Sequence, residues 1–112
     1  MVTIQKAAPC SKGSVASITL ENANGMRVTL LSYGATIQSI VVPDKDGRMT
    51  DVLLGYDRAT DYEVNSGYLG ACIGRNGNRI AGAAFCLNGC RYTLTANEGK
   101  NQLHGGLCGF DK

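Results

Sequence analysis

The stretch Ala83–Leu94 reads AAFCLNGCRYTL, and its centre is the pair Asn88-Gly89. An Asn-Gly pair between two short alternating runs predicts a two-residue β-hairpin turn, because both residues tolerate positive φ. The expected cross-strand pairs are Leu87 with Cys90, Phe85 with Tyr92, and Ala83 with Leu94. All six side chains are apolar or aromatic and share one face, whereas the opposite face is mostly polar. We therefore expect the first face to belong to a core and the second to be solvated.

A hairpin also brings the residues before its first strand close to the residues after its second strand. Continuing the pairing count places Arg79 opposite Glu98, and His104 follows in a segment loosened by three glycines. The sequence therefore predicts that Asn78, Arg79 and His104 meet at the open end of the hairpin. An amide, a guanidinium fork and an imidazole together suit a polyhydroxylated or anionic small molecule.

The rest of the chain consists of short apolar-alternating runs divided by turn residues, with no strong helical period. We expect strands over Ser14–Leu20, Met26–Leu30, Thr36–Val42, Asp51–Gly55 and Gly67–Ile73. A turn over residues 22–25 joins the first two strands into a hairpin, and residues 43–48 end the third. One loose helical turn is expected over Arg58–Val64. This pattern favours an all-β fold of antiparallel strands, a β-sandwich.

Bulk properties exclude several classes of function. The net charge of +2 and the pI of about 8.3 are too weak for a nucleic-acid partner. No apolar run approaches the roughly 20 residues that cross a bilayer, so we expect no membrane partner. The segment Met1–Lys12 lacks a signal-peptide pattern. The five cysteines suggest no disulfide framework, and free thiols in a reducing cytoplasm are the simpler interpretation.

Five short motifs, in matching order and spacing, carry a resemblance to a known family. They are Ser32–Ala35 (SYGA), Asp51–Tyr56 (DVLLGY), Gly74–Ile80 (GRNGNRI), Leu103–Gly106 (LHGG) and Gly109–Lys112 (GFDK). The chain resembles the N-terminal part of aldose 1-epimerases, or galactose mutarotases, from about Leu30 to its last residue. The pairing of NRI with LHGG around an Asn-Gly hairpin is the most specific part of the match.

The resemblance implies a galactose mutarotase-like supersandwich, of which residues 1–112 form the N-terminal portion. Members of the family are much longer, so we expect a chain truncated after Lys112. The missing strand partners leave apolar sheet edges that template association. We therefore expect poor stability or self-association through unpaired strand edges.

The resemblance also implies the reaction, the interconversion of α and β anomers of hexoses such as galactose or glucose. A base takes the proton of the anomeric hydroxyl while an acid protonates the ring oxygen, and the ring opens and recloses. In the family the base is a Glu and the acid a His, both in the later part of the fold. We therefore expect no catalytic residue in this chain and no cofactor. Glu98 and Glu63 are weaker candidates for a base.

By the same resemblance, Asn78, Arg79 and His104 bind the substrate. His104 would hydrogen-bond near the anomeric centre, and Arg79 and Asn78 would bind other sugar hydroxyls. Two alternatives stay open: Arg79 paired with Glu98 across the hairpin, and Asn78 as a turn residue. Arg75 is expected to brace the loop and Asp111 to lie at the surface. Tyr33, Tyr56 and Tyr68 either stack on a sugar or belong to the core.

Two other functions remain open. A non-catalytic carbohydrate-binding module would keep the same three residues without the acid and the base. A small zinc-binding interaction module would use Cys86, Cys90, His104 and Cys108, whose spacing matches zinc sites. A tight Asn88-Gly89 turn would place Cys86 and Cys90 on opposite faces, which argues against a shared ion.

Overall fold

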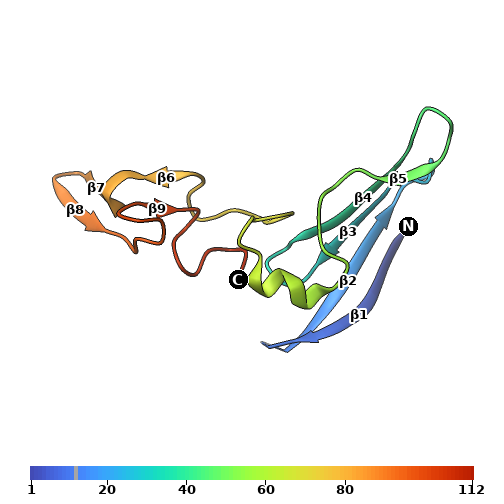
Figure 1. The fold of residues 1–112 in the computed structure, drawn as a ribbon, viewed down its shortest axis with the longest axis horizontal. Coiled ribbons are helices and arrows are strands. Elements are labelled where there is room, and N and C mark those ends of the chain that lie inside the picture. Colours follow the sequence, from blue (N-terminus) through green and yellow to red (C-terminus); the bar gives the residue numbers. More distant parts are fainter. Residues whose placement is uncertain (12) are drawn as a thin grey trace. The chain divides into compact units, whose positions relative to one another are not determined.

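The computed structural model describes residues 1–11 and 13–112, and only the backbone of residues 6–10. Lys12, the end of the segment considered for a signal peptide, and the side chain of Cys10 lie outside the described part. The chain divides into two compact units, Met1–Cys72 and Ile73–Lys112, which we call the sheet unit and the hairpin unit (Figure 1). In the described residues no helix is long and apolar enough to span a membrane.

The sheet unit is built on one antiparallel sheet in which each strand pairs with the next along the chain (Figure 1). Its strands are β1 (Val2–Cys10), β2 (Gly13–Glu21), β3 (Arg27–Leu31), β4 (Ile37–Pro43) and β5 (Met49–Asp51). The predicted strands over residues 14–20, 26–30 and 36–42 are confirmed, as is the β2–β3 hairpin. The strand β1 was not predicted, because its apolar alternation is limited to Val2 and Ile4.

The register separates the two faces of this sheet. One cross-strand row joins Thr19, Thr29 and Ser39, and the next joins Ile18, Leu30 and Ile37. The β3–β4 register shifts between Thr29 and Leu30, which makes Gln38 the extra residue of a β-bulge. Because of this bulge, Ile37 of β4 still lies opposite Leu30 in the aliphatic row, although β4 contains one additional residue.

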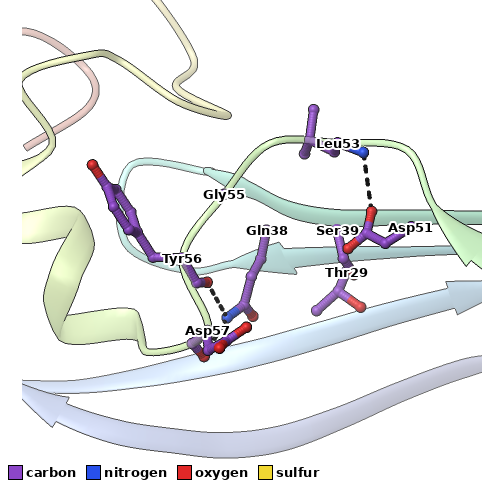
Figure 2. Close-up of a pocket in the computed structure, with 8 residues that line it drawn as sticks. All are labelled: Thr29, Gln38, Ser39, Asp51, Leu53, Gly55, Tyr56 and Asp57. Atoms are coloured by element: carbon purple, nitrogen blue, oxygen red, sulfur yellow. Dashed lines mark hydrogen bonds between the residues drawn. The ribbon is translucent and has the colours of Figure 1, made fainter.

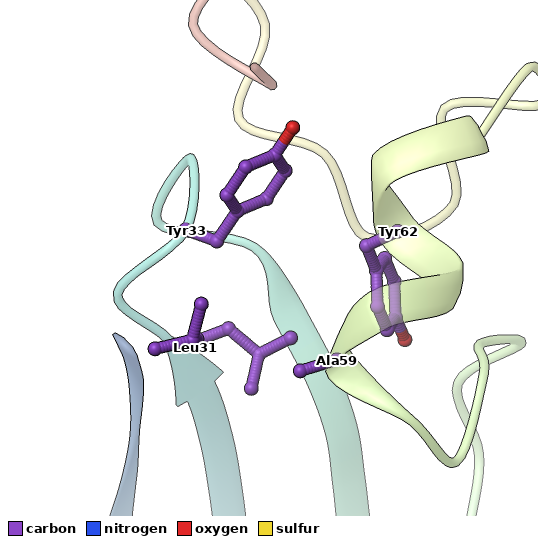
Figure 3. Packing of buried hydrophobic residues seen from close by; sticks show 5 residues of the cluster. Leu31, Tyr33, Ala59 and Tyr62 are labelled. Atoms are coloured by element: carbon purple, nitrogen blue, oxygen red, sulfur yellow. The ribbon is translucent and has the colours of Figure 1, made fainter. Parts of the chain in front are cut away.

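The core of the sheet unit lies where the 3-10 helix η1 (Ala59–Val64) packs against the sheet. Its buried side chains are Val15, Leu31, Tyr33, Ala59 and Tyr62, and Figure 3 shows Leu31 beside Ala59. Tyr62 is only 1% exposed, and its hydroxyl accepts the Tyr56 N–H at 2.9 Å. The Tyr56 ring meets Tyr62 edge to face, 5.2 Å between centroids. The helical turn predicted over residues 58–64 is confirmed, and Tyr33 and Tyr56 pack in or against this core.

Two predicted strands of this unit are wrong. Residues 52–55 form a loop and not a strand, because the Asp51 carboxylate accepts the Leu53 N–H at 3.1 Å and turns the chain. Within residues 67–73 the turns end at Gly70, and residues 71–73 have no regular secondary structure. There the Asn65 side chain binds both the N–H and the C=O of Leu69, at 3.0 and 2.8 Å. An amide side chain thus takes the place of a strand partner.

The hairpin unit contains the predicted Asn-Gly turn. Its elements are β6 (Arg79–Ile80), the 3-10 turn η2 (Ala81–Ala83), β7 (Ala84–Leu87), β8 (Cys90–Thr93) and β9 (Gln102–Leu103). The predicted pairs of Leu87 with Cys90 and Phe85 with Tyr92 are confirmed. Both turn residues have positive φ, 51° at Asn88 and 78° at Gly89, as a type I′ turn requires.

The burial predicted for one face of this hairpin is wrong. Phe85, Leu87 and Tyr92 are 40%, 55% and 46% exposed, although the Phe85 and Tyr92 rings stack 5.1 Å apart. Only Ala83, of the six residues expected in a core, is buried. A two-stranded ribbon cannot bury a face by itself. The all-β, antiparallel class is nevertheless confirmed across both units.

Candidate functional site

The short β6–β9 ladder brings the three predicted site residues together. Arg79 lies opposite Leu103, and beyond it the His104 N–H donates to the Asn78 carbonyl at 3.0 Å. The prediction that Arg79 lies opposite Glu98 in the backbone register is therefore wrong. The reason is that η2 interrupts the strand before β7, and the chain folds into a tight bridge between Glu98 and Asn101.

His104 and Asn78 hold each other by two hydrogen bonds. Besides the backbone bond above, the Asn78 N–H donates to Nδ1 of the His104 ring at 3.0 Å. Because Nδ1 accepts this bond, the neutral imidazole carries its proton on Nε2, which is then a donor. Both residues have positive φ, 56° and 52°. Asn78 is therefore a turn residue with left-handed backbone, one of the two roles left open for it, and its side chain is also engaged.

Arg79 links this pair to Glu98. Its Nε lies 2.9 and 2.6 Å from the two Glu98 carboxylate oxygens, and Nη2 bonds Oε1 as well. Its Nη1 donates to the Asn78 Oδ1 at 3.2 Å. The ion pair considered as an alternative role for Arg79 is therefore present. One bonded network now joins Glu98, Arg79, Asn78 and His104.

The charge state of Glu98 follows from this network. Its hydrogen bond with Arg79 holds the pKa of the carboxyl below its ordinary value of 4.5, and the positive charge of Arg79 acts in the same direction. The same hydrogen bond raises the pKa of Arg79. A general base for sugar chemistry needs a pKa closer to neutrality. Glu98 therefore fits an ion-pair role better than the role of a base.

Close backbone approach positions the His104 loop. A Cβ added to Gly105, which has φ +91°, would lie 2.1 Å from the Gly74 carbonyl oxygen. A Cβ added to Gly74 would lie 2.2 Å from the Phe110 ring. The glycines of the GRNGNRI and LHGG motifs thus allow two segments far apart in the sequence to touch.

Asn97 braces the same loop and was missed by the sequence analysis. Its Nδ2 donates to the carbonyls of Leu103 and Gly106 at 3.0 and 3.3 Å, and its Oδ1 accepts the Leu103 N–H at 2.7 Å. An Asn beside a glycine-rich loop is a common turn signal. The signal was present in the sequence, but its partners could not be assigned.

Arg75 and Asp111 were predicted to brace the loop and to lie at the surface, respectively, and the structure agrees with the first prediction only. The Arg75 guanidinium lies over the Phe110 ring, 5.4 Å from its centroid, in agreement with a bracing role. Asp111, expected at the surface, is 5% exposed, so that prediction is wrong. Its carboxylate lies 2.8 Å from the Lys112 Nζ, which offsets the cost of burying the charge.

The residues of the zinc alternative are placed as follows. Cys86 pairs with Arg91 and Leu87 pairs with Cys90, so the two cysteines lie on opposite faces of the ribbon. Within the described residues, no group of three or more His, Cys, Asp or Glu side chains is arranged to hold a metal ion.

The sheet unit contains a polar pocket whose lining side chains hold a loop against the sheet (Figure 2). It is lined by β3 and β4 side chains and by the segment 51–57, which contains the DVLLGY motif. Gln38 of the bulge donates from Nε2 to the carbonyls of Tyr56 and Asp57, at 3.2 and 2.9 Å. Asp51 accepts the Ile40 N–H at 3.0 Å. These polar groups fasten the loop to the sheet.

Known proteins resemble the chain in sequence. The family model for aldose 1-epimerase matches residues 16–111. A galactose mutarotase from Bos taurus is 41% identical over 116 residues, covering 100% of this chain and 34% of the relative. An aldose 1-epimerase from Haemophilus influenzae is 52% identical over 95 residues, covering 85% of this chain and 27% of the relative.

Solved structures agree with the sequence matches. A GalM/aldose epimerase homologue from C. elegans superposes with a TM-score of 0.82 at 36% identity, covering 87% of this chain and 30% of that one. A galactose 1-epimerase from Lactobacillus acidophilus NCFM gives 0.82 at 30% identity, covering 99% and 32%. The chain thus spans about a third of the length of these relatives. The resemblance carried by the five motifs is confirmed, and the chain belongs to the aldose 1-epimerase family.

Proposed function

We propose that this chain supplies the sugar-contacting part of an aldose 1-epimerase acting on hexoses such as galactose or glucose. The observation that supports the proposal most is the hydrogen-bonded chain from His104 through Asn78 to Arg79. Relatives named galactose mutarotase and aldose 1-epimerase support the substrate class. The three residues are proposed as substrate-binding residues.

Each residue offers a different group to a polyhydroxylated ring. The His104 Nε2–H is a donor that can bind a hydroxyl near the anomeric centre, held in place by the bond at Nδ1. The guanidinium of Arg79 offers planar donors to neighbouring hydroxyls. The Asn78 amide can both donate and accept. A fixed arrangement of this kind orients a sugar before any proton moves.

Turnover requires an acid and a base in addition. We propose that the carboxylate that removes the anomeric proton and the imidazole that protonates the ring oxygen come from outside residues 1–112. The chain has one histidine, His104, which we assign to binding. The chain would then correspond to the N-terminal portion of the enzyme and would bind sugar without accelerating mutarotation.

We also propose a reducing compartment, the cytoplasm, for this protein. The four cysteines whose side chains are described, Cys72, Cys86, Cys90 and Cys108, are exposed and form no disulfide. Exposed thiols persist where cellular reductants keep them reduced.

Self-association is proposed through the sheet edges. In the described residues β1 and β5 are the outer strands of the five-stranded sheet, and unpaired outer edges can add a further strand. Sizing at increasing protein concentration checks this proposal, and a strictly monomeric chain would contradict it.

The experiment that tests sugar binding is a calorimetric titration of the chain with D-galactose. We expect Arg79→Ala to weaken binding about tenfold or more, because a hydrogen bond to a charged group contributes strongly when its partner is desolvated. Arg91→Ala, which removes the same charge from an exposed position of β8, is the matched control and should bind as the unmodified chain does. Equal binding by both variants would contradict the assignment of Arg79.

Polarimetry on freshly dissolved α-D-galactose then separates turnover from binding. Binding without acceleration is the expected result for the chain alone. Acceleration would show that the acid and the base lie within residues 1–112 and would contradict their proposed absence. A chain that neither binds galactose nor accelerates its mutarotation would contradict the sugar assignment itself.

A further inference from the structure

Glu98 occupies one defined side of the Arg79 guanidinium. The carboxylate contacts Nε with both oxygens, at 2.9 and 2.6 Å, and contacts Nη2 with Oε1. This is the side-on, forked arrangement that fixes the plane of the guanidinium as well as its position. A side chain with several rotatable bonds is thereby held in one orientation.

The hydrogen-bond inventory of Arg79 shows what Glu98 leaves over. A guanidinium has five N–H donors. The Glu98 carboxylate takes the Nε donor and one donor on Nη2, and the Asn78 Oδ1 takes one on Nη1 at 3.2 Å. Two N–H donors therefore have no acceptor among the residues that the structure describes. The Arg79 side chain is 52% exposed, so these donors can reach a ligand.

Glu98 is itself held by its surroundings. Its N–H donates to the Asn101 carbonyl at 3.1 Å, and the Asn101 N–H donates back to the Glu98 carbonyl at 2.9 Å. Asn101 in turn accepts the Gly82 N–H on its side chain at 3.1 Å, which ties the bridge to the η2 turn. Glu98 therefore projects from a closed bridge and not from a loose loop.

We propose that Glu98 is a positioning residue for sugar binding, holding the side-on edge of Arg79 so that its two remaining N–H groups face a hexose. This inference rests on the proposed function and adds a residue that touches no sugar itself. It also assigns a role to the ion pair that the sequence analysis regarded only as an alternative to sugar binding. The ion pair and the sugar then use different donors of the same guanidinium.

The rival outcome is that Glu98 competes with the ligand. If sugar hydroxyls needed the side-on edge, the carboxylate would have to be displaced first, and its removal would strengthen binding. The two roles therefore predict opposite signs for the same substitution.

The test compares Glu98→Gln with the full unmodified chain in D-galactose titrations. Glutamine keeps the size of the side chain but removes its charge, so we expect binding to weaken about fivefold, while the melting temperature stays unchanged because exposed ion pairs contribute little stability. The Arg79 Nε–H signal in proton–nitrogen spectra should lose its downfield position in the variant. Glu98→Asp, which keeps the charge, should restore part of the affinity.

A control substitution in the sheet unit separates the effect of Glu98 from the general effect of removing a carboxylate. Glu21→Gln removes an exposed carboxylate in the sheet unit and should change neither the affinity nor the Arg79 signal. Unchanged or tighter galactose binding by Glu98→Gln, with binding still lost in Arg79→Ala, would overturn the positioning role alone. Absence of galactose binding by the unmodified chain would overturn the proposed function, and the positioning role with it.

Discussion

Each of the two units of this chain is stabilised internally, and the dominant interaction differs between them. The sheet unit has a buried cluster in which Leu31 and Tyr62 are each 1% exposed, and its two longest strands have nine residues each. In the hairpin unit, as the structure describes it, Ala83 is the one apolar side chain that is buried. The hairpin unit relies instead on side-chain hydrogen bonds and on close contacts made by glycines. Hydrophobic burial dominates the first unit, and polar geometry dominates the second.

The difference explains where the candidate site lies. Hydrophobic packing tolerates small shifts in side-chain position, whereas hydrogen bonds weaken steeply with distance and angle. A binding site for hydroxyl groups needs fixed donors, and the Asn78, Arg79 and His104 network supplies them. The cost is that a single methyl group in the wrong place can disturb the network. The comparison can be tested by substitutions that affect one unit or the other.

The largest effect is expected in the core of the sheet unit. Leu31→Ala should lower the free energy of unfolding by about 3 kcal/mol, because it removes buried methyl groups and leaves a cavity. Denaturant unfolding of the full chain measures this. Leu87→Ala, at a position that is 55% exposed, is the matched control and should cost less than about 0.5 kcal/mol. Equal losses at the two positions would remove the contrast between the units.

A smaller effect on stability, but a larger one on the site, is expected from Gly105→Ala. The added methyl group would lie 2.1 Å from the Gly74 carbonyl oxygen, at φ +91°. We expect a loss of about 2 kcal/mol together with loss of the His104 to Asn78 hydrogen bond, seen as a changed imidazole nitrogen shift. Gly82→Ala also has positive φ but meets no atom within 4 Å, so it should leave the imidazole shift unchanged. A normal imidazole shift in Gly105→Ala would contradict the role assigned to this contact.

The smallest effect is a pH dependence of the Arg79–Glu98 pair. The pKa of Glu98 is lowered in the folded chain, chiefly by its hydrogen bond with Arg79, with smaller contributions from Asn101 and His104. The contribution of the ionised Glu98 to the stability of the folded chain is therefore complete at pH values above its ordinary pKa of 4.5. This contribution is lost as the pH falls through the lowered folded-state pKa. A carboxyl carbon titration by NMR should show a midpoint below 4.5, and Arg79→Ala should move it back up. A midpoint at or above 4.5 in the unmodified chain would contradict the pair.

Local signals account for what the sequence predicted well. Asn88 and Gly89 encode their turn by themselves, so the β7–β8 register followed. Thr36–Val42 was found because β-branched alternation marks a strand without reference to its neighbours. The meeting of Asn78 with His104 was also predicted, although by a pairing count that places Arg79 opposite the wrong residue. The η2 turn interrupts the strand pairing on which that count depends, and no local sequence pattern predicts this turn.

Non-local effects account for what the sequence predicted badly. Whether the Phe85 face is buried depends on what packs against it, which alternation cannot say. Residues 67–73 alternate like a strand, yet the Asn65 side chain takes the backbone groups of Leu69. Asp111 is charged but buried. In each case the deciding partner lies outside the local sequence pattern.

The most direct test of the central claim is a map of proton–nitrogen chemical shifts of the full chain as D-galactose is added. The account predicts saturable changes at Asn78, at the Arg79 Nε–H and at the His104 ring, with the sheet unit unaffected. Changes confined to the polar pocket around Gln38 and Asp57, or to the exposed Phe85 and Tyr92 pair, would contradict it. So would a spectrum that galactose leaves unchanged at every concentration.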